Sequence, residues 1–331
     1  MRAAIIPRYG PPRVVRIVDL PDPYPAVGEV LVRVRATTVS SGDARVRGFN
    51  VPGVFWIPAR LALGILRPRR RVMGTEFAGV IESVGEGVTD FKPGDRVFGM
   101  ASFSKPTGTH AELLTIEADG LVEPMPADMD FDEAGCICFG LLTARHFLQK
   151  AAEVRPGERV LIVGASGAVG CAAVQLAKHV GAHVTAVCSL RHIDLVRSLG
   201  ANEIIDYTKA SYIDRADGHE LYDIVFDAVG ATSPAACRRV LAQGGRFISV
   251  VMDAETIAQA LWYSVSRKIR VIMGIDSAAP EDLVYFREMI EAGAYRSVIE
   301  SRFPLERIRE AHEIVEGGHK QGNVVITIGE G

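Results

Sequence analysis

The segment VLIVGASGAVGCAAVQLAKHVGAHVTAVCSL, which runs from Val160 to Leu190, limits the possible folds of this chain more than any other stretch. An apolar run leads into three closely spaced glycines, Gly164, Gly167 and Gly170, and an apolar pattern at helical spacing follows them. A second apolar run then ends just before Leu190. This order predicts a strand, a tight turn, a helix and a second, parallel strand, which together form a βαβ unit.

The same alternation of short apolar strands and helices continues to about residue 275. Strands of this kind are buried on both faces, so they indicate an α/β fold in which helices cover each side of a parallel sheet. The helical part begins in DFDEAGCICFGLLTARHFLQKAAEV, where Asp130 or Asp132 provides an N-terminal cap. The predicted strands are Arg159–Val163, His183–Val187, Glu203–Ile205, Tyr222–Phe226, Arg246–Val251 and Arg270–Ile275. The predicted helices are Ala168–Val180, Ile193–Leu199, Ser233–Leu241, Glu281–Glu291 and Glu306–Glu316.

The first 120 residues instead contain many short strands separated by glycine and proline turns. In EVLVRVRATTV, one face at period two carries apolar side chains and the other carries Arg33 and Arg35, as in a strand with one buried face. The apolar residues are Val30, Val32, Val34 and Ala36. Many such strands predict an antiparallel barrel. We expect the alternating last strand, Val324–Ile328, to return to this barrel. The predicted domains are therefore 1–128, completed by 276–331, and 129–275.

Length and composition agree with this division and exclude several classes of function. A chain of 331 residues is too long for one ordinary core. Its net charge is only −3 with the signs mixed, which argues against a nucleic-acid partner. No apolar stretch reaches the roughly 18 residues that span a bilayer, and MRAAIIPRYG lacks the apolar core of a signal peptide. We therefore expect a cytoplasmic protein with no nucleic-acid or membrane partner.

Two neighbouring segments leave alternatives open. The densest basic run, RPRRR from Arg67 to Arg71, is typical of a solvated loop or of a gate near an anionic ligand. The preceding VFWIPARLALGIL, Val54–Leu66, is typical of core or of a segment that covers the barrel. If it borders a cleft instead, Phe55 and Trp56 could stack on a flat ring.

The cysteines predict no disulfide and no structural metal site. An odd number of cysteines, mostly within apolar segments, is typical of reduced, buried thiols. Cys136 and Cys138 form a C-x-C pair, and no second pair follows at the spacing of a zinc finger. The five cysteines are Cys136, Cys138, Cys171, Cys188 and Cys237.

The glycine turn has the features of a dinucleotide-binding loop. The fingerprint G-x-G-x-x-G would fall on positions 165, 167 and 170, so the chain departs from it at Ala165. Gly167 still lets the backbone approach a pyrophosphate, and Gly170 still lets the helix pack closely on the strand. The helix N-terminus adds unpaired N–H groups and a partial positive charge. Because the whole βαβ unit is present, we predict a bound dinucleotide rather than a bare structural bend.

The residues after the second strand select between the two nicotinamide dinucleotides. An Asp or Glu at this point would hold the ribose hydroxyls of NAD. This chain has Ser189 there, with Arg191 shortly after, and a hydroxyl and a guanidinium fit a phosphate. The nearest acid, Asp194, should point elsewhere on its helix. The sequence favours NADPH, unless Arg191 only begins an exposed helix.

Six segments in order give this chain a resemblance that covers nearly its full length. It resembles the medium-chain dehydrogenase/reductase superfamily, which combines a GroES-like barrel with a Rossmann nucleotide-binding domain. Any one of the segments is modest support, and together they are strong. The segments are GTEFAGVIESVGEGVTDFKPGDRVFG (Gly74–Gly99), GLLTARHFL (Gly140–Leu148), GASGAVG, SLGANEIIDY (Ser198–Tyr207), FDAVG (Phe226–Gly230) and GHKQGNVVI (Gly318–Ile326).

The zinc ligands of that superfamily are missing here. Its zinc alcohol dehydrogenases carry a Gly-His-Glu element whose His binds the catalytic metal, and this chain has Thr75 between Gly74 and Glu76. Where those enzymes place a Cys ligand, this chain reads TTVSSGD, and no Cys precedes Cys136. The chain is therefore expected to hold no metal, and it resembles the zinc-free quinone oxidoreductase branch, in particular the reticulon-interacting-protein-like NADPH oxidoreductases.

This resemblance implies NADPH-dependent reduction of a quinone or an α,β-unsaturated carbonyl. It also implies which residues contact the cofactor, from the pyrophosphate and the 2′-phosphate to the nicotinamide and a tail element. These are Thr143, Ser166, Gly167, Ala168, Val169, Gly170, Ser189, Arg191, Tyr207, Val229, Gly230, Lys320, Gln321, Gly322 and Asn323.

No general acid can be assigned. Quinone oxidoreductases often have V-N-x-x-D-x-Y, whereas this chain has Ser40 in place of the Asn and Arg45 in place of the Tyr. Hydride transfer to an electron-poor carbon gives an enolate or quinol anion, which Ser40, Arg45, Arg47 or the backbone near Thr143 could stabilise while water supplies the proton. Alternatively, Ser40 and Asp43 cap a short helix, and the two arginines are simply exposed.

Two other functions and one assembly remain open. A protein that binds NADPH without turnover, as a redox sensor or structural partner, would show the same turn, and a zinc-type alcohol dehydrogenase is a further alternative. The strand Ile269–Ile275 is expected at the edge of the parallel sheet. In the superfamily that this chain resembles, such edge strands commonly pair across a two-fold axis, so the resemblance implies a homodimer.

Overall fold

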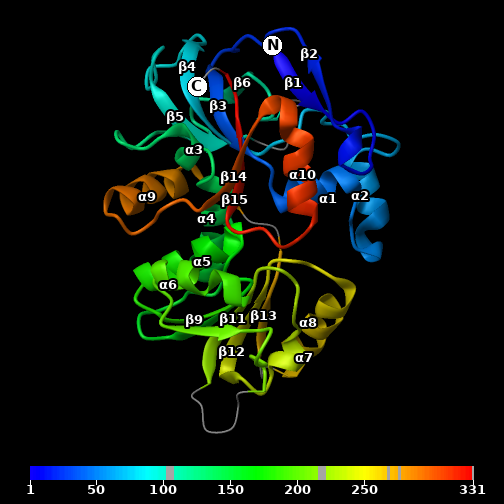
Figure 1. The fold of residues 1–331 in the computed structure, drawn as a ribbon, viewed down its shortest axis with the longest axis vertical. Helices are drawn as coiled ribbons and strands as arrows, with labels where there is room; N and C mark the ends of the chain where they lie inside the picture. Colours follow the sequence, from blue (N-terminus) through cyan, green and yellow to red (C-terminus); the bar gives the residue numbers. More distant parts are fainter. Residues whose placement is uncertain (102–107, 215–220, 267–268, 275–276, 330–331) are drawn as a thin grey trace. The chain divides into compact units, whose positions relative to one another are not determined.

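The computed structural model (Figure 1) describes residues 1–101, 108–214, 221–266, 269–274 and 277–329. The chain divides into two compact units. One combines Met1–Phe139 with Ala278–Gly331, and the other is Gly140–Ser277. The sequence-based boundary between 275 and 276 falls outside the described residues.

The second unit is built on a parallel sheet, which confirms the predicted α/β class. In its described part six strands lie in the order β10-β9-β8-β11-β12-β13, so the chain leaves β8 first in one direction and later in the other. This is the doubly wound arrangement of nucleotide-binding domains. The strands are β8 (Arg159–Val163), β9 (His183–Cys188), β10 (Glu203–Asp206), β11 (Tyr222–Asp227), β12 (Leu241–Ser249) and β13 (Arg270–Ile272).

Helices alternate with these strands, as predicted. The longest fully packed one, α5, is buried without interruption from Ala168 to Ala177 and contacts β8 and β9. Near the start of this unit, α4 continues directly into the π-helical segment η3. The helices are α4 (Cys138–Arg145), η3 (His146–Ala151), α5 (Ala168–His179), η4 (Leu190–His192), α6 (Ile193–Ser198), α7 (Pro234–Cys237) and α8 (Ala254–Ser266).

Three expectations for this unit are corrected by the structure. The helix predicted at Ser233–Leu241 is only the four-residue α7, because Leu241 pairs with Tyr222 and begins β12. The strand predicted at Arg246–Val251 is therefore the second part of β12, which ends at Ser249. The described part of β13 stops at Ile272. The helix α8 was not predicted.

The first unit contains a mostly antiparallel sheet in the order β14-β15-β3-β4-β5-β7, with β6 also paired to β3. The final strand β15 pairs antiparallel with β3, which confirms that the chain returns to the first unit. The strand β14, which was not predicted, adds to β15 in parallel. The strands are β1 (Arg2–Ile5), β2 (Arg16–Asp19), β3 (Glu29–Thr38), β4 (Glu76–Val84), β5 (Arg96–Met100), β6 (Leu113–Glu117), β7 (Val122–Pro124), β14 (Ile299–Pro304) and β15 (Asn323–Thr327).

Short helices complete the first unit. Asp130 accepts a hydrogen bond from Glu133 N at 2.8 Å and caps α3, as predicted. The helix α10 packs against α1, β14 and β15. The helices are η1 (Pro12–Val14), α1 (Ser41–Gly48), η2 (Gly53–Phe55), α2 (Trp56–Leu63), α3 (Phe131–Ala134), α9 (Pro280–Glu291), η5 (Leu305–Arg307) and α10 (Ile308–Glu316).

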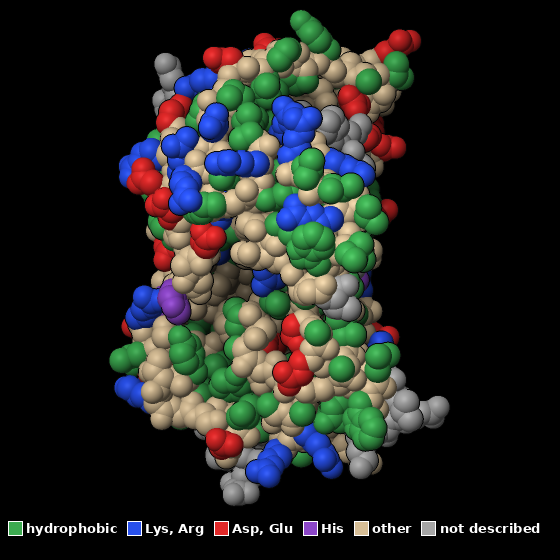
Figure 2. Space-filling model, turned by 90° about the vertical axis from the view of Figure 1, so that its right-hand side faces the viewer, with side chains coloured by type: hydrophobic (Ala, Val, Ile, Leu, Met, Phe, Trp, Pro, Cys, Tyr) green, Lys and Arg blue, Asp and Glu red, His purple; other side chains and the backbone are tan. Residues whose placement is uncertain are grey.

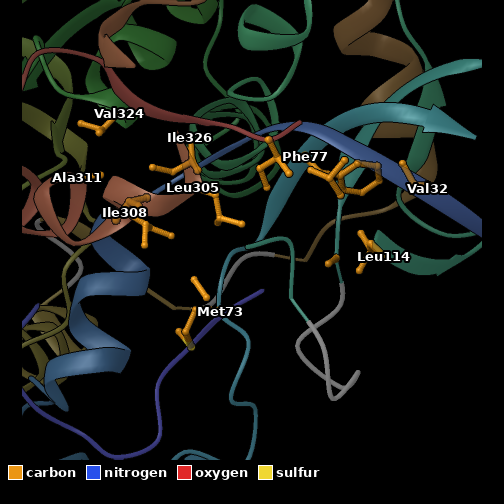
Figure 3. Packing of buried hydrophobic residues seen from close by; sticks show 14 of the residues in the cluster. Val32, Met73, Phe77, Leu114, Leu305, Ile308, Ala311, Val324 and Ile326 are labelled. Carbon is orange, nitrogen blue, oxygen red and sulfur yellow. The ribbon is translucent and has the colours of Figure 1, made fainter. Parts of the chain in front are cut away.

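The core of the first unit joins the beginning and the end of the sequence. Figure 3 shows Ile308 and Ala311 of α10 beside Leu305 and Ile326. All four follow β7, which ends at Pro124, by more than 180 residues. Val32, Phe77 and Leu114 from three different strands belong to the same buried cluster. Burial of about 25 cal/mol for each Å² of apolar surface makes this shared cluster the main force that holds the C-terminal segment on the barrel.

A buried polar contact ties α1 to the rest of this unit. The guanidinium of Arg47 is wholly buried, donates to the carbonyl of Gly10 at 2.6 Å and lies 3.2 Å from a carboxylate oxygen of Glu316. Next to it, His312 is wholly buried in α10, and its burial, with Arg47 nearby, holds its pKa well below the usual value. Arg47 is therefore structural, and neither expectation for it, an exposed position or charge stabilisation at a cleft, fits its burial.

The segment Val54–Leu66 departs most from expectation. The prediction that it forms core is wrong, because α2, which makes up most of it, contains no buried residue. The side chains of Ile57, Leu61 and Leu66 are exposed instead. Apolar composition predicted burial here, but only the three-dimensional path of the chain decides it.

Other sequence-based expectations are confirmed. All five cysteines are buried and unpaired by disulfides. The strand β13 lies at an edge of the described parallel sheet, whereas the oligomeric state stays a prediction. Within the described ranges, no helix combines the length and the apolar character needed to cross a bilayer.

Candidate nucleotide-binding turn and buried carboxylate cluster

The glycine turn between β8 and α5 is shaped by two close approaches. Gly164 has φ +78°, and a Cβ on it would lie 2.6 Å from the Val229 side chain. A Cβ on Gly170 would lie 2.1 Å from the carbonyl oxygen of Gly164, so only glycine lets α5 approach β8 this closely. Of the fingerprint glycines, Gly170 thus has the role expected of it, close packing of the helix on the strand, and the neighbouring Ala165 is fully buried.

Gly167 has a different role from its two neighbours. It is the N-cap of α5 with φ −77° and makes no side-chain cap, and a Cβ on it would meet a single atom within 4 Å, Gly164 O at 3.6 Å. The backbone therefore does not require glycine here, and the space above it is open. Ser166 precedes Gly167, and Ala168 and Val169 are the first two residues of α5. The first backbone N–H groups of a helix have no partner within the helix, so this end of α5 suits an anion.

The residues predicted for the 2′-phosphate lie together after β9 and β10. Asp206 pairs with Cys188 in the parallel ladder, and Tyr207 N donates to Cys188 O at 3.2 Å, so Tyr207 and Ser189 follow neighbouring strand ends. Ser189 is the N-cap of η4, and its hydroxyl lies 3.4 Å from Nδ1 of His192. Arg191 and Tyr207 are both exposed.

Two acids lie near this group of residues. Asp194 is exposed and forms an ion pair with Arg197 at 3.0 Å, three residues further along α6. Asp206, which the sequence analysis did not consider, accepts hydrogen bonds from the Thr208 hydroxyl at 2.7 Å and the Thr208 N–H at 3.0 Å, and these bonds keep its pKa below the usual value. Asp206 therefore closes the turn after β10 through Oδ1.

The loop with Val229 and Gly230 depends on an acid that sequence reasoning missed. Asp227 ends β11, is wholly buried and accepts hydrogen bonds from the backbone N–H groups of Val229 and Gly230 at 3.0 and 2.8 Å and of Thr232 at 2.9 Å. Three donors on one carboxylate fix the loop so that Val229 packs on Gly164. The sequence contained a signal for this role, because Asp227 in FDAVG stands at the end of an apolar run, directly before the loop that it holds.

The other predicted cofactor contacts are divided between the units. Thr143 lies on α4 and is mostly buried. In the first unit, the ammonium of Lys320 donates to Gly322 O, and Gly322 has φ +59° with Val298 O closely beside it. Asn323 donates to Val298 O through both its N–H (2.8 Å) and its side chain (3.1 Å), so it starts β15 as a structural residue. Gln321 is partly exposed.

The catalytic candidates of the first unit have clear local roles. Ser40 caps α1: its hydroxyl donates to Asp43 Oδ2 at 2.6 Å and accepts from Asp43 N at 3.1 Å. The other oxygen of Asp43 accepts from Gly74 N at 3.0 Å. The capping alternative therefore describes Ser40 and Asp43 in the structure, while Arg45 is exposed on α1.

Glu76 is a buried carboxylate of the first unit with a raised pKa. It accepts hydrogen bonds from the Thr38 hydroxyl at 2.5 Å and from Phe139 N, in the first turn of α4, at 2.8 Å. Burial raises the pKa of Glu76 to about 7, although both hydrogen bonds act in the opposite direction. Glu76 thus connects strands β3 and β4 to the start of α4, a role that the sequence did not reveal.

A buried histidine adjoins this cluster. His110 is buried, one of its ring nitrogens lies 2.8 Å from Thr38 O, and desolvation lowers its pKa. It packs edge-on against His312, with 6.1 Å between the ring centres. His146, in the second unit, accepts from Ser277 N at 3.4 Å. Both histidines therefore have structural contacts.

These features together define a class: an α/β oxidoreductase with a doubly wound nucleotide domain and a barrel domain. Two family models match, one described as Alcohol dehydrogenase GroES-like domain over residues 26–127 and one as Zinc-binding dehydrogenase over residues 199–326. Quinone oxidoreductase of Rattus norvegicus is 30% identical over 351 residues, covering 99% of this chain and 98% of the relative. The human mitochondrial NAD(P)H oxidoreductase RTN4IP1 is 30% identical over 361 residues, covering 99% of this chain and 89% of the relative.

A solved structure agrees with these sequence relatives. The crystal structure of an NAD-dependent alcohol dehydrogenase matches this chain with a TM-score of 0.87 at 27% sequence identity. The match covers 99% of this chain and 100% of the alcohol dehydrogenase chain. The chain belongs to the medium-chain dehydrogenase/reductase superfamily. It is an oxidoreductase of that superfamily, and its relatives imply a nicotinamide cofactor.

One matching family is described as zinc-binding, and the chemistry of the residues around Glu76 bears on that metal. Thr75 replaces the histidine ligand, and both oxygens of Glu76 are bound by Thr38 and Phe139. Burial, with Glu76 nearby, raises the pKa of the Cys136 and Cys138 thiols, so both stay protonated and are poor ligands. No group of three His, Cys, Asp or Glu side chains in the described ranges could hold a metal ion. The residues of these described ranges do not fit a zinc site.

Glu76 makes a testable contribution to pH-dependent stability. Its folded pKa of about 7 lies above the unfolded value of 4.5, so the native state loses stability as the pH rises from 4.5 to 7. Relative to the wild type, Glu76→Gln should gain about 3 kcal/mol in unfolding free energy between pH 4.5 and 8. Urea unfolding at a series of pH values measures this gain.

The matched control is Glu82→Gln on the same strand, where the carboxylate faces Arg33 at 2.6 Å at the surface. This control should follow the wild-type pH profile closely. An equal profile for Glu76→Gln and the wild type would contradict the raised pKa.

Proposed function

We propose that this protein transfers hydride from NADPH to a quinone or an α,β-unsaturated carbonyl without the help of a metal. The observation that carries the cofactor choice is Ser189 at the carboxyl end of β9, beside Tyr207, where NAD-specific relatives of this fold place an acid. The names of the sequence relatives, quinone oxidoreductase and NAD(P)H oxidoreductase, support the reaction class.

The chain's own residues would bind and position the dinucleotide. The N–H groups that follow Gly167 would receive the pyrophosphate, and the Asp227-supported loop with Val229 and Gly230 would border it. Ser189, Arg191 and Tyr207 would meet the 2′-phosphate, because an exposed guanidinium and hydroxyls bind a phosphate well in this geometry. The remaining proposed contacts are Thr143, Ser166, Ala168, Val169, Gly170, Lys320, Gln321, Gly322 and Asn323.

When bound, the nicotinamide supplies the hydride, and the protein has to stabilise the anion that develops on the acceptor. Because the Ser40 hydroxyl already donates to Asp43, we assign this role first to Arg45 and to the surroundings of Thr143. Water would then protonate the enolate or quinol anion. We keep the further expectation of a cytoplasmic homodimer that is joined at the edge strand β13.

The central experiment measures NADPH oxidation by the purified chain with 9,10-phenanthrenequinone and with a reactive enone, before and after treatment with a metal chelator. We expect turnover with at least one acceptor and no loss of rate after chelation. Tight NADPH binding without turnover across a panel of acceptors would support the redox sensor instead. Stoichiometric zinc and loss of rate after chelation would support a zinc alcohol dehydrogenase.

Gly167→Val tests the phosphate site without a large cost in stability. The backbone at 167 suits any residue, so the substitution should cost only about 1 kcal/mol for the poorer N-cap while its side chain enters the open space above the turn. We expect the Kd for NADPH to rise about 100-fold or more, because the added methyl groups prevent close approach of the phosphate.

Gly170→Ala is the contrasting control, since its Cβ would lie 2.1 Å from Gly164 O and should destabilise the fold itself. Titration of NADPH by fluorescence, with urea unfolding of each variant, separates the two effects. Unchanged NADPH affinity in a folded Gly167→Val variant would mean that the dinucleotide binds elsewhere.

Ser189→Asp combined with Arg191→Ala tests the choice between the two dinucleotides. The new carboxylate can accept the ribose hydroxyls of NADH and repels a 2′-phosphate, while the phosphate loses its guanidinium partner. We expect the ratio of kcat/KM for NADPH to that for NADH to fall about 100-fold, which corresponds to about 2.7 kcal/mol. An unchanged ratio would show that these residues do not contact the 2′-phosphate.

A further inference from the structure

The exposed surface around α2 has an unusual composition that the proposed reaction does not use. Five large apolar side chains on α2 and the turn after it are between 49 and 87% exposed, and α2 has no buried residue. All five lie within eleven consecutive residues of the chain, on α2 and the turn that follows it. This surface, which we call the α2 face, consists of Trp56, Ile57, Leu61, Ile65 and Leu66.

The α2 face is held firmly in this exposed position. The guanidinium of Arg60 lies over three aromatic rings, with its carbon 3.8 Å from the ring centre of Phe49, 4.7 Å from that of Tyr9 and 5.0 Å from that of Trp56. The Tyr9 hydroxyl also donates to Gly64 O at 2.9 Å. The helix is thus anchored through a cation and polar groups, and its apolar side chains are left to face outward.

The charge of the same segment has one sign only. Between Asp43 and Glu76 the chain contains no acidic residue and seven arginines, although the whole protein has a net charge of −3. Three of these arginines, Arg67, Arg69 and Arg71, are exposed directly after Leu66. Arg70 turns inward instead, where it donates to Gly74 O at 2.7 Å. Figure 2 shows basic and hydrophobic side chains side by side on the surface of the first unit.

We propose that the α2 face and the three exposed arginines dock this protein onto the surface of an anionic lipid bilayer. Apolar side chains that include a Trp, next to a polybasic run, match the interface between acyl chains and anionic headgroups. The described helices do not cross a membrane, so the contact is peripheral. This proposal replaces the sequence-based expectation of no membrane partner, which rested on the lack of a membrane-spanning stretch. A second copy of this chain fits less well, because pairing of two α2 faces would bring their arginines together.

This docking gives the proposed function a substrate class. It rests on the proposed function in one respect only: a quinone reductase at a bilayer surface can take lipid-soluble quinones from the membrane. The binding itself needs neither the cofactor nor an acceptor, so it can be measured separately.

The test is flotation of the full-length protein with vesicles, in the absence of nucleotide and acceptor. We expect binding to vesicles of phosphatidylcholine mixed with phosphatidylglycerol, weak binding to phosphatidylcholine alone, and release at high salt. Replacing the exposed arginines (Arg67→Gln, Arg69→Gln, Arg71→Gln) should lower the partition coefficient about 100-fold. Leu61→Ser with Leu66→Ser should lower it at low and at high salt alike.

The matched control is Leu261→Ser with Trp262→Ser on α8, two apolar side chains that are 68 and 75% exposed in the other unit. This variant should bind vesicles like the wild type. No binding to anionic vesicles at low salt, or an equal loss in the α8 control, would overturn the proposal. Self-association that the α2 variants abolish would identify the face as an interface between copies, and a raised KM for phenanthrenequinone with unchanged vesicle binding would identify it as a substrate wall.

The same preparations separate this proposal from the proposed function. NADPH oxidation with phenanthrenequinone is measured without vesicles, so a protein that turns over and does not bind vesicles contradicts only the docking. A protein that binds vesicles and shows no turnover contradicts only the proposed reaction.

Discussion

The close approach of α5 to β8 is the constraint on which the second unit depends. With only hydrogen on Gly170 facing Gly164 O, the helix begins directly at the end of the strand, and its first N–H groups stay unpaired by any side chain. Asp227 completes the arrangement, because three backbone donors hold its loop and place Val229 on Gly164. The contact between Val229 and Gly164 thereby brings the loops after β8 and β11 together beside the N-terminus of α5, which suits an anion.

Two buried carboxylates, Asp43 and Glu76, organise one part of the first unit. Asp43 completes the capping box of α1 by accepting from Ser40, and it also accepts from Gly74 N. Two residues after Gly74, Glu76 accepts from Thr38 and from the start of α4. A zinc site in this superfamily would need ligands near these positions. In this chain the carboxylates of Asp43 and Glu76 instead accept hydrogen bonds from backbone N–H groups and hydroxyls, so their role in the structure is to stabilise the fold.

The sequence predicted those features that depend on neighbours along the chain. The glycine turn, the strand ends at Ser189 and the cap at Asp130 follow from local sterics and hydrogen bonding, and the structure has them where they were expected. The role of Glu76 could not be predicted, because its partners come from distant parts of the chain. The four-residue α7 was missed for a related reason: pairing of Leu241 with Tyr222 overrode helix propensity.

The α2 segment shows where apolar composition misleads and why. Its residues resemble core, and a core would have been stabilised by their burial, yet the chain holds this helix outward through Arg60 and three aromatic rings. Exposure of five large apolar side chains costs free energy in water unless something covers them. The exposed arginines that follow α2 would repel a basic partner surface. The segment is therefore best matched by a lipid bilayer, in which anionic headgroups lie over apolar acyl chains.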